Sequence, residues 1–131
     1  MPFIDTKKLQ VIERAPGWFG RFFHSPSMTF ANYEFKSGSL VHEHFHEQEE
    51  VWQVMEGEVE FTLDGRSKVI KPGMAAVVPG GVKHSIKALT DGRAMIVDYP
   101  LRPDADGRAH RRHSARKVSE GSKPAARRAG K

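Results

Sequence analysis

The chain has 131 residues, a formal net charge of +5 and no cysteine. This length suits one domain with one core, and the lack of cysteine excludes disulfides, thiolate metal sites and a cysteine nucleophile. No apolar run is long enough to span a bilayer, and the first ten residues lack the apolar stretch of a signal peptide. We therefore expect a cytoplasmic protein with no membrane insertion.

Turn-forming residues interrupt the first hundred residues at short intervals, and the runs between them are rich in Val, Ile, Phe and Tyr. This pattern is typical of an all-β sandwich or barrel, and no segment has sustained helical periodicity. We expect residues 1–27 to form N-terminal strands that pack on a barrel of residues 28–101. The expected strands, among eight to ten in all, include 18–24, 28–35, 58–63, 66–71, 73–78 and 94–99.

Two of these runs have a clear burial pattern. Residues 58–63 alternate polar and apolar side chains, which indicates a strand with one buried face. Asp64-Gly65 follows as a two-residue hairpin turn, because glycine adopts a positive φ without steric cost. Residues 73–78 are mostly apolar, and we expect that strand to be buried on both faces.

The composition changes abruptly near residue 102, where the positive charge begins. Residues 1–101 carry 11 Lys and Arg against 13 Asp and Glu, whereas residues 102–131 carry 10 against 3. We predict that residues 102–131 form a disordered basic tail, because they offer almost no apolar surface to bury. A solvated extension is its simplest role, and any contact with nucleic acid would be weak, non-specific and salt-dependent.

A histidine-rich segment is the strongest functional signal of the chain. It contains His42, His44 and His46, followed by Glu50. Side chains alternate along a strand, so we expect the three histidines to share one face. Glu50 begins the next strand and can add a carboxylate, and Glu49 is its only rival by position.

A second segment supplies one more imidazole. Pro79, Gly80 and Gly81 form a tight turn, and His84 begins the strand beyond it. We predict that His44, His46, Glu50 and His84 bind one divalent metal ion. Three imidazoles and a carboxylate suit Fe, Mn, Ni, Co, Cu or Zn, and the ligand set does not select among these transition metals.

Further residues are candidates for roles around the ion. Glu50 is a candidate catalytic base, and His42 is a candidate proton carrier or a spare polar residue. Trp52 and Val54 lie two and four residues after Glu50, so they share its face of the strand and should point to the interior. With Phe35 they are candidates to line a pocket, although ordinary core packing is the simpler role.

The two segments resemble the paired motifs of the cupin superfamily. The first reads G-x5-H-x-H-x3-E-x6-G from Gly38 to Gly57, and the second reads G-x5-P-x-G-x2-H from Gly73 to His84. Cupins usually add an Asn four residues after that His, where this chain has Ala88. The resemblance implies an all-β double-stranded β-helix, or jelly-roll barrel, and a homodimer built by strand exchange or sheet pairing near the N-terminus.

A closer likeness is to the small cupins that linearise unsaturated uronates in pectin and alginate breakdown. Residues 46–48, 88–92 and 97–100 look similar to the corresponding stretches of those proteins. They typically have Gln where this chain has Glu50, which changes the charge of the site by one unit.

Three functions follow from these features. The leading hypothesis is a metal-dependent enzyme that acts on a small polar organic molecule by dioxygenase-, isomerase- or lyase-type chemistry. The first alternative is a non-catalytic cupin that binds or senses a small molecule such as a sugar acid. The second alternative is a uronate-linearising cupin.

Overall fold

The computed structural model describes residues 3–103 of the chain. Of the expected tail, only Arg102 and Pro103 belong to this part, and the remainder of that prediction falls outside the described residues. One short 3-10 helix, η1 (Thr6–Lys8), precedes ten strands. The strands are β1 (Val11–Ala15), β2 (Trp18–His24), β3 (Thr29–Phe35), β4 (Leu40–His44), β5 (Glu49–Glu56), β6 (Val59–Leu63), β7 (Arg66–Ile70), β8 (Ala75–Val78), β9 (His84–Ala88) and β10 (Gly92–Tyr99).

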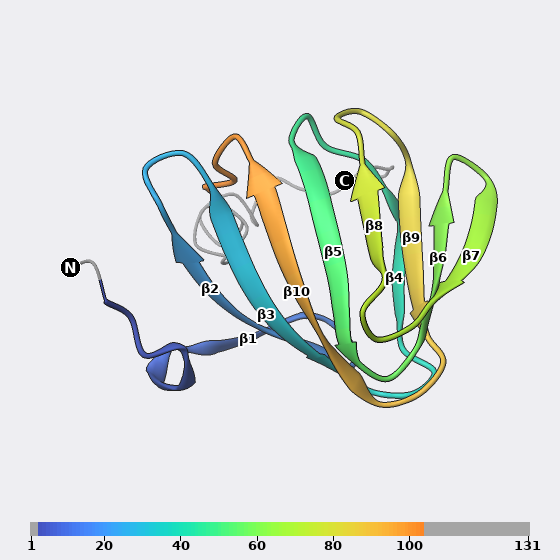
Figure 1. Ribbon diagram of the computed structural model, residues 1–131, viewed down its shortest axis with the longest axis horizontal. Helices are drawn as coiled ribbons and strands as arrows, with labels where there is room; N and C mark the ends of the chain where they lie inside the picture. The colour runs from blue at the N-terminus through green and yellow to red at the C-terminus, as the bar shows by residue number, and fades with distance from the viewer. Residues whose placement is uncertain (1–2, 104–131) are drawn as a thin grey trace, which may run out of the picture.

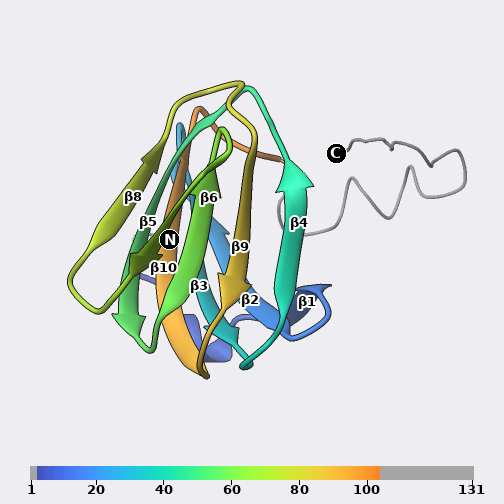
Figure 2. The same cartoon turned by 90° about the vertical axis from the view of Figure 1, so that its right-hand side faces the viewer.

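The strands form two antiparallel sheets that face each other. The six-stranded sheet has the order β1-β2-β3-β10-β5-β8, and the four-stranded sheet has the order β4-β9-β6-β7. Figure 1 shows the outer face of the six-stranded sheet towards the viewer, and Figure 2 looks onto the four-stranded sheet. The prediction of an all-β fold is confirmed, and no helix in the described part is long and apolar enough to cross a membrane.

The side chains of each strand alternate between the interior and the solvent. In β5, Glu50, Trp52 and Val54 are buried and the residues between them are exposed. The expectation that residues 73–78 are buried on both faces is wrong, because β8 is an edge strand whose outer face is uncovered. Val77 in its centre is 60 % exposed.

The interior has two chemically different ends. The apolar end, at the bottom of Figure 1, contains the buried Trp18, Phe35, Val54, Val59 and Ala88. The polar end, at the top, lies where β5 and β9 begin and where β4 and β10 finish. The polar residues buried near it are Thr29, Gln48, Glu50, His84 and Asp98.

Candidate metal centre

The two motif segments meet because one turn packs directly on the other. The Gly81 N–H donates to the carbonyl oxygen of His46 at 2.8 Å. A Cβ atom on Gly80 would lie 2.3 Å from the carbonyl oxygen of Glu47, so any larger residue would force the turns apart. This contact sets β9 beside β4, where His84 pairs with His44 across the sheet.

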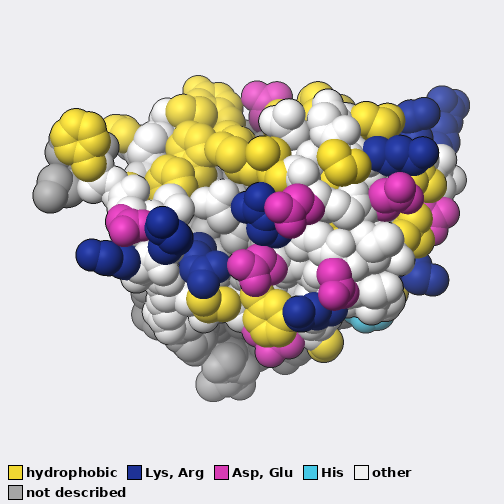
Figure 3. All heavy atoms as spheres, turned by 60° about the horizontal axis from the view of Figure 1, so that its bottom comes forward, with side chains coloured by type: hydrophobic (Ala, Val, Ile, Leu, Met, Phe, Trp, Pro, Cys, Tyr) yellow, Lys and Arg dark blue, Asp and Glu magenta, His cyan; other side chains and the backbone are white. Residues whose placement is uncertain are grey.

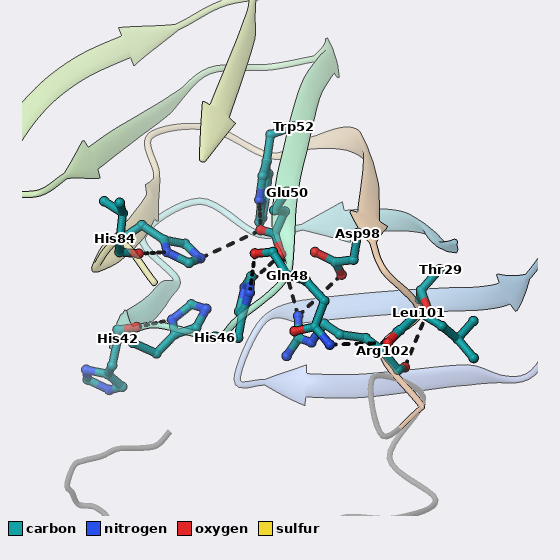
Figure 4. Close-up of polar contacts among 12 residues, drawn as sticks. Thr29, His42, His46, Gln48, Glu50, Trp52, His84, Asp98, Leu101 and Arg102 are labelled. Atoms are coloured by element: carbon teal, nitrogen blue, oxygen red, sulfur yellow. Dashed lines mark hydrogen bonds and ion pairs between the residues drawn. The ribbon is translucent and has the colours of Figure 1, made fainter. Parts of the chain in front are cut away.

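Three of the predicted ligands converge on one point. The ring centroids of His44 and His84 are 4.2 Å apart, and that of His46 is 5.0 Å from His84. One nitrogen from each ring lies within 4.8 Å of the others. Figure 4 shows the rings of His46 and His84 turned towards Glu50 at the start of β5.

Backbone carbonyls fix the protonation of all three rings. Nδ1 of His44, His46 and His84 lies 2.8, 3.0 and 2.9 Å from the carbonyl oxygens of residues 42, 48 and 82. A carbonyl oxygen only accepts, so each Nδ1 carries a hydrogen and each neutral ring keeps its Nε2 lone pair free. This second contact from each imidazole is the usual way in which a protein orients a histidine ligand.

Glu50 lies beside the imidazoles, and its position provides a test of whether a metal ion fits. Its Oε1 is 3.1 Å from His46 Nε2, and its Oε2 is 3.8 Å from His84 Nε2. Neighbouring ligands of an octahedral ion with bonds of about 2.1 Å lie about 3.0 Å apart. The buried Nε2 atoms of His46 and His84 have no hydrogen-bond partner among the described residues. The lone pair of His46 Nε2 and the carboxylate oxygen of Glu50 repel each other unless a positive centre lies between them and bonds to both. A metal ion is such a centre, so this set of donor atoms fits a metal ion.

His42 does not share the face of the ligands, and that expectation is wrong. The pairing of β4 with β9 shifts between Val41 and His44, which is a β-bulge that breaks the alternation. His42 is therefore exposed, and its ring points away from the cluster in Figure 4. Its backbone carbonyl, which orients His44, is its contribution to the site in this structure.

Asp98 is a site residue that the sequence analysis missed. It is 3 % exposed, and its carboxylate belongs to a second group of possible ligands with His46 and Glu50. In β10, Asp98 lies on the same buried face as Ala94 and Ile96. The alternation of the sequence in this strand could have indicated a site residue, because a carboxyl on the buried face of a strand requires a partner.

Arg102 is the second missed residue, because we assigned it to the tail. Its Nη1 lies 3.5 Å from Glu50 Oε1 and 3.4 Å from Asp98 Oδ2. Its backbone N–H donates to Thr29 Oγ1 at 2.8 Å, which ties the end of the barrel to β3. Arg102 is thus bonded to the barrel, although the composition of the chain changes at this residue.

The buried groups divide into one ionised and one neutral carboxyl. Burial opposes the ionisation of Glu50, but His46, Asp98 and Arg102 together hold its pKa well below the usual value. Burial and the negative charge of Glu50 raise the pKa of Asp98 to about 9. Burial lowers the pKa of His44 to about 3 and that of His84 in the same direction, so these two rings are neutral at pH 7.

The three candidate pocket residues have different positions. Trp52 Nε1 donates to Glu50 Oε2, so this indole borders the site (Figure 4). Val54 lies four residues beyond Glu50 in β5, which is a distance of about 13 Å at about 3.3 Å per residue. Phe35 packs on Trp18 at the apolar end, with ring centroids 5.0 Å apart. Val54 and Phe35 are therefore core residues in this structure.

Comparisons with known proteins agree with this architecture. A family model described as a Cupin domain matches residues 31–100, which is more than half of the chain. A search of curated proteins found no match. An RmlC-like cupin from Shewanella frigidimarina superposes with a TM-score of 0.75 at 24 % identity, covering 79 % of this chain and 95 % of its own.

Two further structures have named activities or metals. KdgF from Halomonas sp. has a TM-score of 0.74 at 25 % identity and covers 79 % of this chain and 97 % of its own. An oxalate decarboxylase from Bacillus subtilis, with Mn(II) centres, has a TM-score of 0.66 at 21 % identity. It is matched over 74 % of this chain but only 29 % of its own. These likenesses confirm the jelly-roll barrel that the sequence predicts.

Proposed function

The chain belongs to the cupin family, and from that membership we propose that it is a metal-dependent enzyme acting on a small molecule that carries a carboxylate. His44, His46, His84 and Glu50 would hold one divalent transition ion. The observation that carries the proposal is the set of oriented imidazoles with free Nε2 atoms, two of them buried without a partner among the described residues. When bound, the ion would supply Lewis acidity that polarises a carbonyl or carboxylate oxygen.

The residues beside the imidazoles favour proton transfer as the reaction type. Asp98 and Glu50 are neighbouring buried carboxyls, and the Arg102 guanidinium lies within 3.5 Å of an oxygen of each. Asp98 is not one of the four proposed ligands, and in the absence of a metal ion its pKa is raised, so it is the carboxyl placed to carry a proton in general acid–base catalysis. This arrangement favours isomerase- or lyase-type chemistry over dioxygenase-type chemistry.

The charge of the site favours an anionic substrate. A divalent ion and the Arg102 guanidinium together outweigh the negative charges of Glu50 and Asp98, even when both carboxyls are ionised. In a buried setting this surplus positive charge stabilises a carboxylate strongly. A sugar acid offers both that carboxylate and the carbonyl or hydroxyl groups on which protons move.

Linearisation of an unsaturated uronate is the specific reaction that we propose to test first. The sequence likeness to uronate-linearising cupins motivates it, and the similarity to KdgF over nearly the whole length of that protein supports it. The departure at Glu50 adds a negative charge at the metal, which would weaken the Lewis acidity of the ion relative to an amide ligand.

The test is an activity screen of tag-free protein loaded separately with Mn, Fe, Co, Ni, Cu and Zn. The panel contains unsaturated uronates, other sugar acids, diketones and flavonols, with product and dissolved oxygen both measured. Turnover of a sugar acid without oxygen uptake supports the proposal. Oxygen-dependent turnover of a diketone or flavonol indicates a dioxygenase, and saturable binding without product for every metal indicates a binding or sensing protein.

A further inference from the structure

The segment that follows the last strand carries the arginine of the site but belongs to neither sheet. β10 ends at Tyr99, and residues 100–102 continue from it beside the polar end of the barrel. A segment without strand pairing takes its position from other bonds, since its backbone groups still need partners. The side chains that hold residues 100–102 therefore determine where Arg102 lies.

One of these side chains is a buried threonine on β3. Thr29 is 1 % exposed, and its Oγ1 accepts the backbone N–H of Arg102 at 2.8 Å (Figure 4). The same hydroxyl lies 3.4 Å from the carbonyl oxygen of Arg102 and 2.9 Å from Nδ1 of His24. A hydrogen bond to a buried hydroxyl is costly to break, because the backbone group would lose its partner away from water. Thr29 thus fixes the main chain at Arg102.

A glutamine provides a second anchor one residue earlier. The side-chain amide of Gln48 donates to the carbonyl oxygen of Leu101 at 3.2 Å, and Gln48 is 7 % exposed. The backbone carbonyl of Gln48 also accepts the hydrogen of His46 Nδ1 at 3.0 Å. Gln48 therefore connects the turn that carries a candidate metal ligand to the segment that carries the arginine.

The anchored main chain and the guanidinium lie along one row of buried polar residues. Thr29, Asp98 and Glu50 are lateral neighbours across β3, β10 and β5. Arg102 is bonded through its main chain to the first of them and through its guanidinium to the other two. Fixing the start of a long side chain lowers the entropy that the side chain loses when it binds a ligand.

Charged side chains on the outside of the barrel lie in a different setting. On the face shown in Figure 3, the Lys and Arg side chains lie among Asp and Glu side chains. Arg93, for example, pairs with Glu56 at 3.0 Å, and both side chains are more than half exposed. Exposed charges of this kind bind a small anion weakly, because water and salt screen them. The Arg102 side chain is only 20 % exposed, so it is better placed to bind a carboxylate.

We propose that Thr29 is a positioning residue for substrate recognition, which holds Arg102 through its main chain so that the guanidinium meets a substrate carboxylate at the polar end. This role rests on the proposed function, in which the substrate is a small carboxylate. Thr29 acts through Arg102 and is given no contact with the substrate. Its hydroxyl should therefore matter for ligand affinity only while the arginine is present.

The test is a double-mutant cycle on zinc-loaded, full-length protein, with D-galacturonate as the carboxylate probe and calorimetry as the measurement. Thr29→Val keeps the shape of the side chain but removes the hydroxyl, and it should weaken binding about fivefold because the arginine must then be ordered on binding. In the Arg102→Met background the same substitution should change affinity by less than about twofold. An equal loss in both backgrounds indicates a merely structural role and overturns the proposal.

Two matched variants complete the cycle. Thr29→Ser keeps the hydroxyl and should retain the affinity of the wild type within about twofold. Thr62→Val removes a hydroxyl that pairs with Ser67 Oγ at 2.7 Å on the four-stranded sheet, and it should have as little effect. Should Thr29→Val fail to fold, Gln48→Met removes the other anchor and enters the same cycle, where equal losses with and without the arginine again overturn the proposal.

A second measurement follows the anchor itself and needs no substrate. Amide hydrogen exchange of the same zinc-loaded proteins, read by NMR, reports on the backbone N–H of Arg102. Thr29→Val should make this exchange at least about tenfold faster, whereas the amides of β9 should change by less than about threefold. If exchange responds in this way but the wild type does not bind the probe, the anchor is supported and the carboxylate function fails. Equal exchange at Arg102 in the wild type and Thr29→Val shows that Thr29 does not position this residue, whatever the protein binds.

Discussion

The polar and apolar ends of the barrel interior are built from the same strands but have different roles, one in the proposed chemistry and one in stability. In β5, Glu50 lies at one end and Val54 at the other, and in β10 the same contrast holds between Asp98 and Ala94. At the apolar end, burial of large side chains stabilises the fold. At the polar end, buried carboxyls and imidazoles lose hydration, which opposes folding unless they find partners. We therefore expect substitutions at the apolar end to change stability and substitutions at the polar end to change metal binding and chemistry.

The largest effect is expected at the apolar end. Phe35→Ala removes a ring packed on Trp18, so the free energy of unfolding should fall by about 4 kcal/mol. Phe3→Ala, at a position 83 % exposed, should change it by less than about 0.5 kcal/mol. Urea denaturation measures both values. Metal affinity of the folded Phe35 variant should stay within about threefold of wild type, and a larger loss would show that the two ends are coupled.

The next effect is expected at the metal ligands. His46→Ala should lower metal affinity more than about 100-fold, because removal of a ligand costs more than the 10–100-fold typical of its supporting residues. His42→Ala is the matched control, since the same strand segment retains the backbone carbonyl that orients His44. Competitive titration with a coloured chelator measures both. Equal losses in the two variants would contradict the assignment of the ligands.

A smaller effect is expected from the arginine beside the carboxyls. Arg102→Met removes the charge near Glu50 and Asp98, and affinity for a carboxylate ligand should fall about tenfold. Arg93→Met breaks an exposed pair with Glu56 and should change that affinity by less than twofold. Calorimetric titration of metal-loaded protein with the ligand from the activity screen measures both. An unchanged affinity in the Arg102 variant would remove this residue from the site.

The smallest effect concerns pH. In metal-free protein, the lowered pKa of His44 and His84 means that the unfolded chain binds more protons, so stability falls as the pH drops below about 6.5. The raised pKa of Asp98 has the opposite sign, since the folded chain holds the extra proton and stability falls as the pH rises from about 4 towards 9. Asp98→Asn should remove the alkaline loss and raise the melting temperature at pH 9 by about 5 °C. A melting curve whose pH dependence is unchanged by this substitution would contradict a protonated Asp98.

Sequence reasoning predicted the architecture and the grouping of the histidines more fully than the rest of the site. Alternation and turn chemistry are local properties, so the β-rich fold follows from them. The grouping of His84 with His44 was predicted from the two cupin-like motifs, because local pattern does not specify which distant strands pair. The outward position of His42 could not be predicted, because a bulge shifts the register by one residue without a sequence signal. Arg102 was missed because its bonds to Glu50 and Asp98 depend on tertiary structure across a boundary in composition.

In the proposed metal centre, three oriented imidazoles and Glu50 bind one ion. X-ray absorption spectroscopy on tag-free, metal-loaded protein, together with elemental analysis, identifies the atoms that coordinate the ion and the number of ions per chain. We expect one transition metal per chain with three imidazole nitrogens at about 2.1 Å and a carboxylate oxygen in the same shell. A shell of oxygen atoms alone, or a metal content that stays far below one per chain with every ion offered, would contradict it.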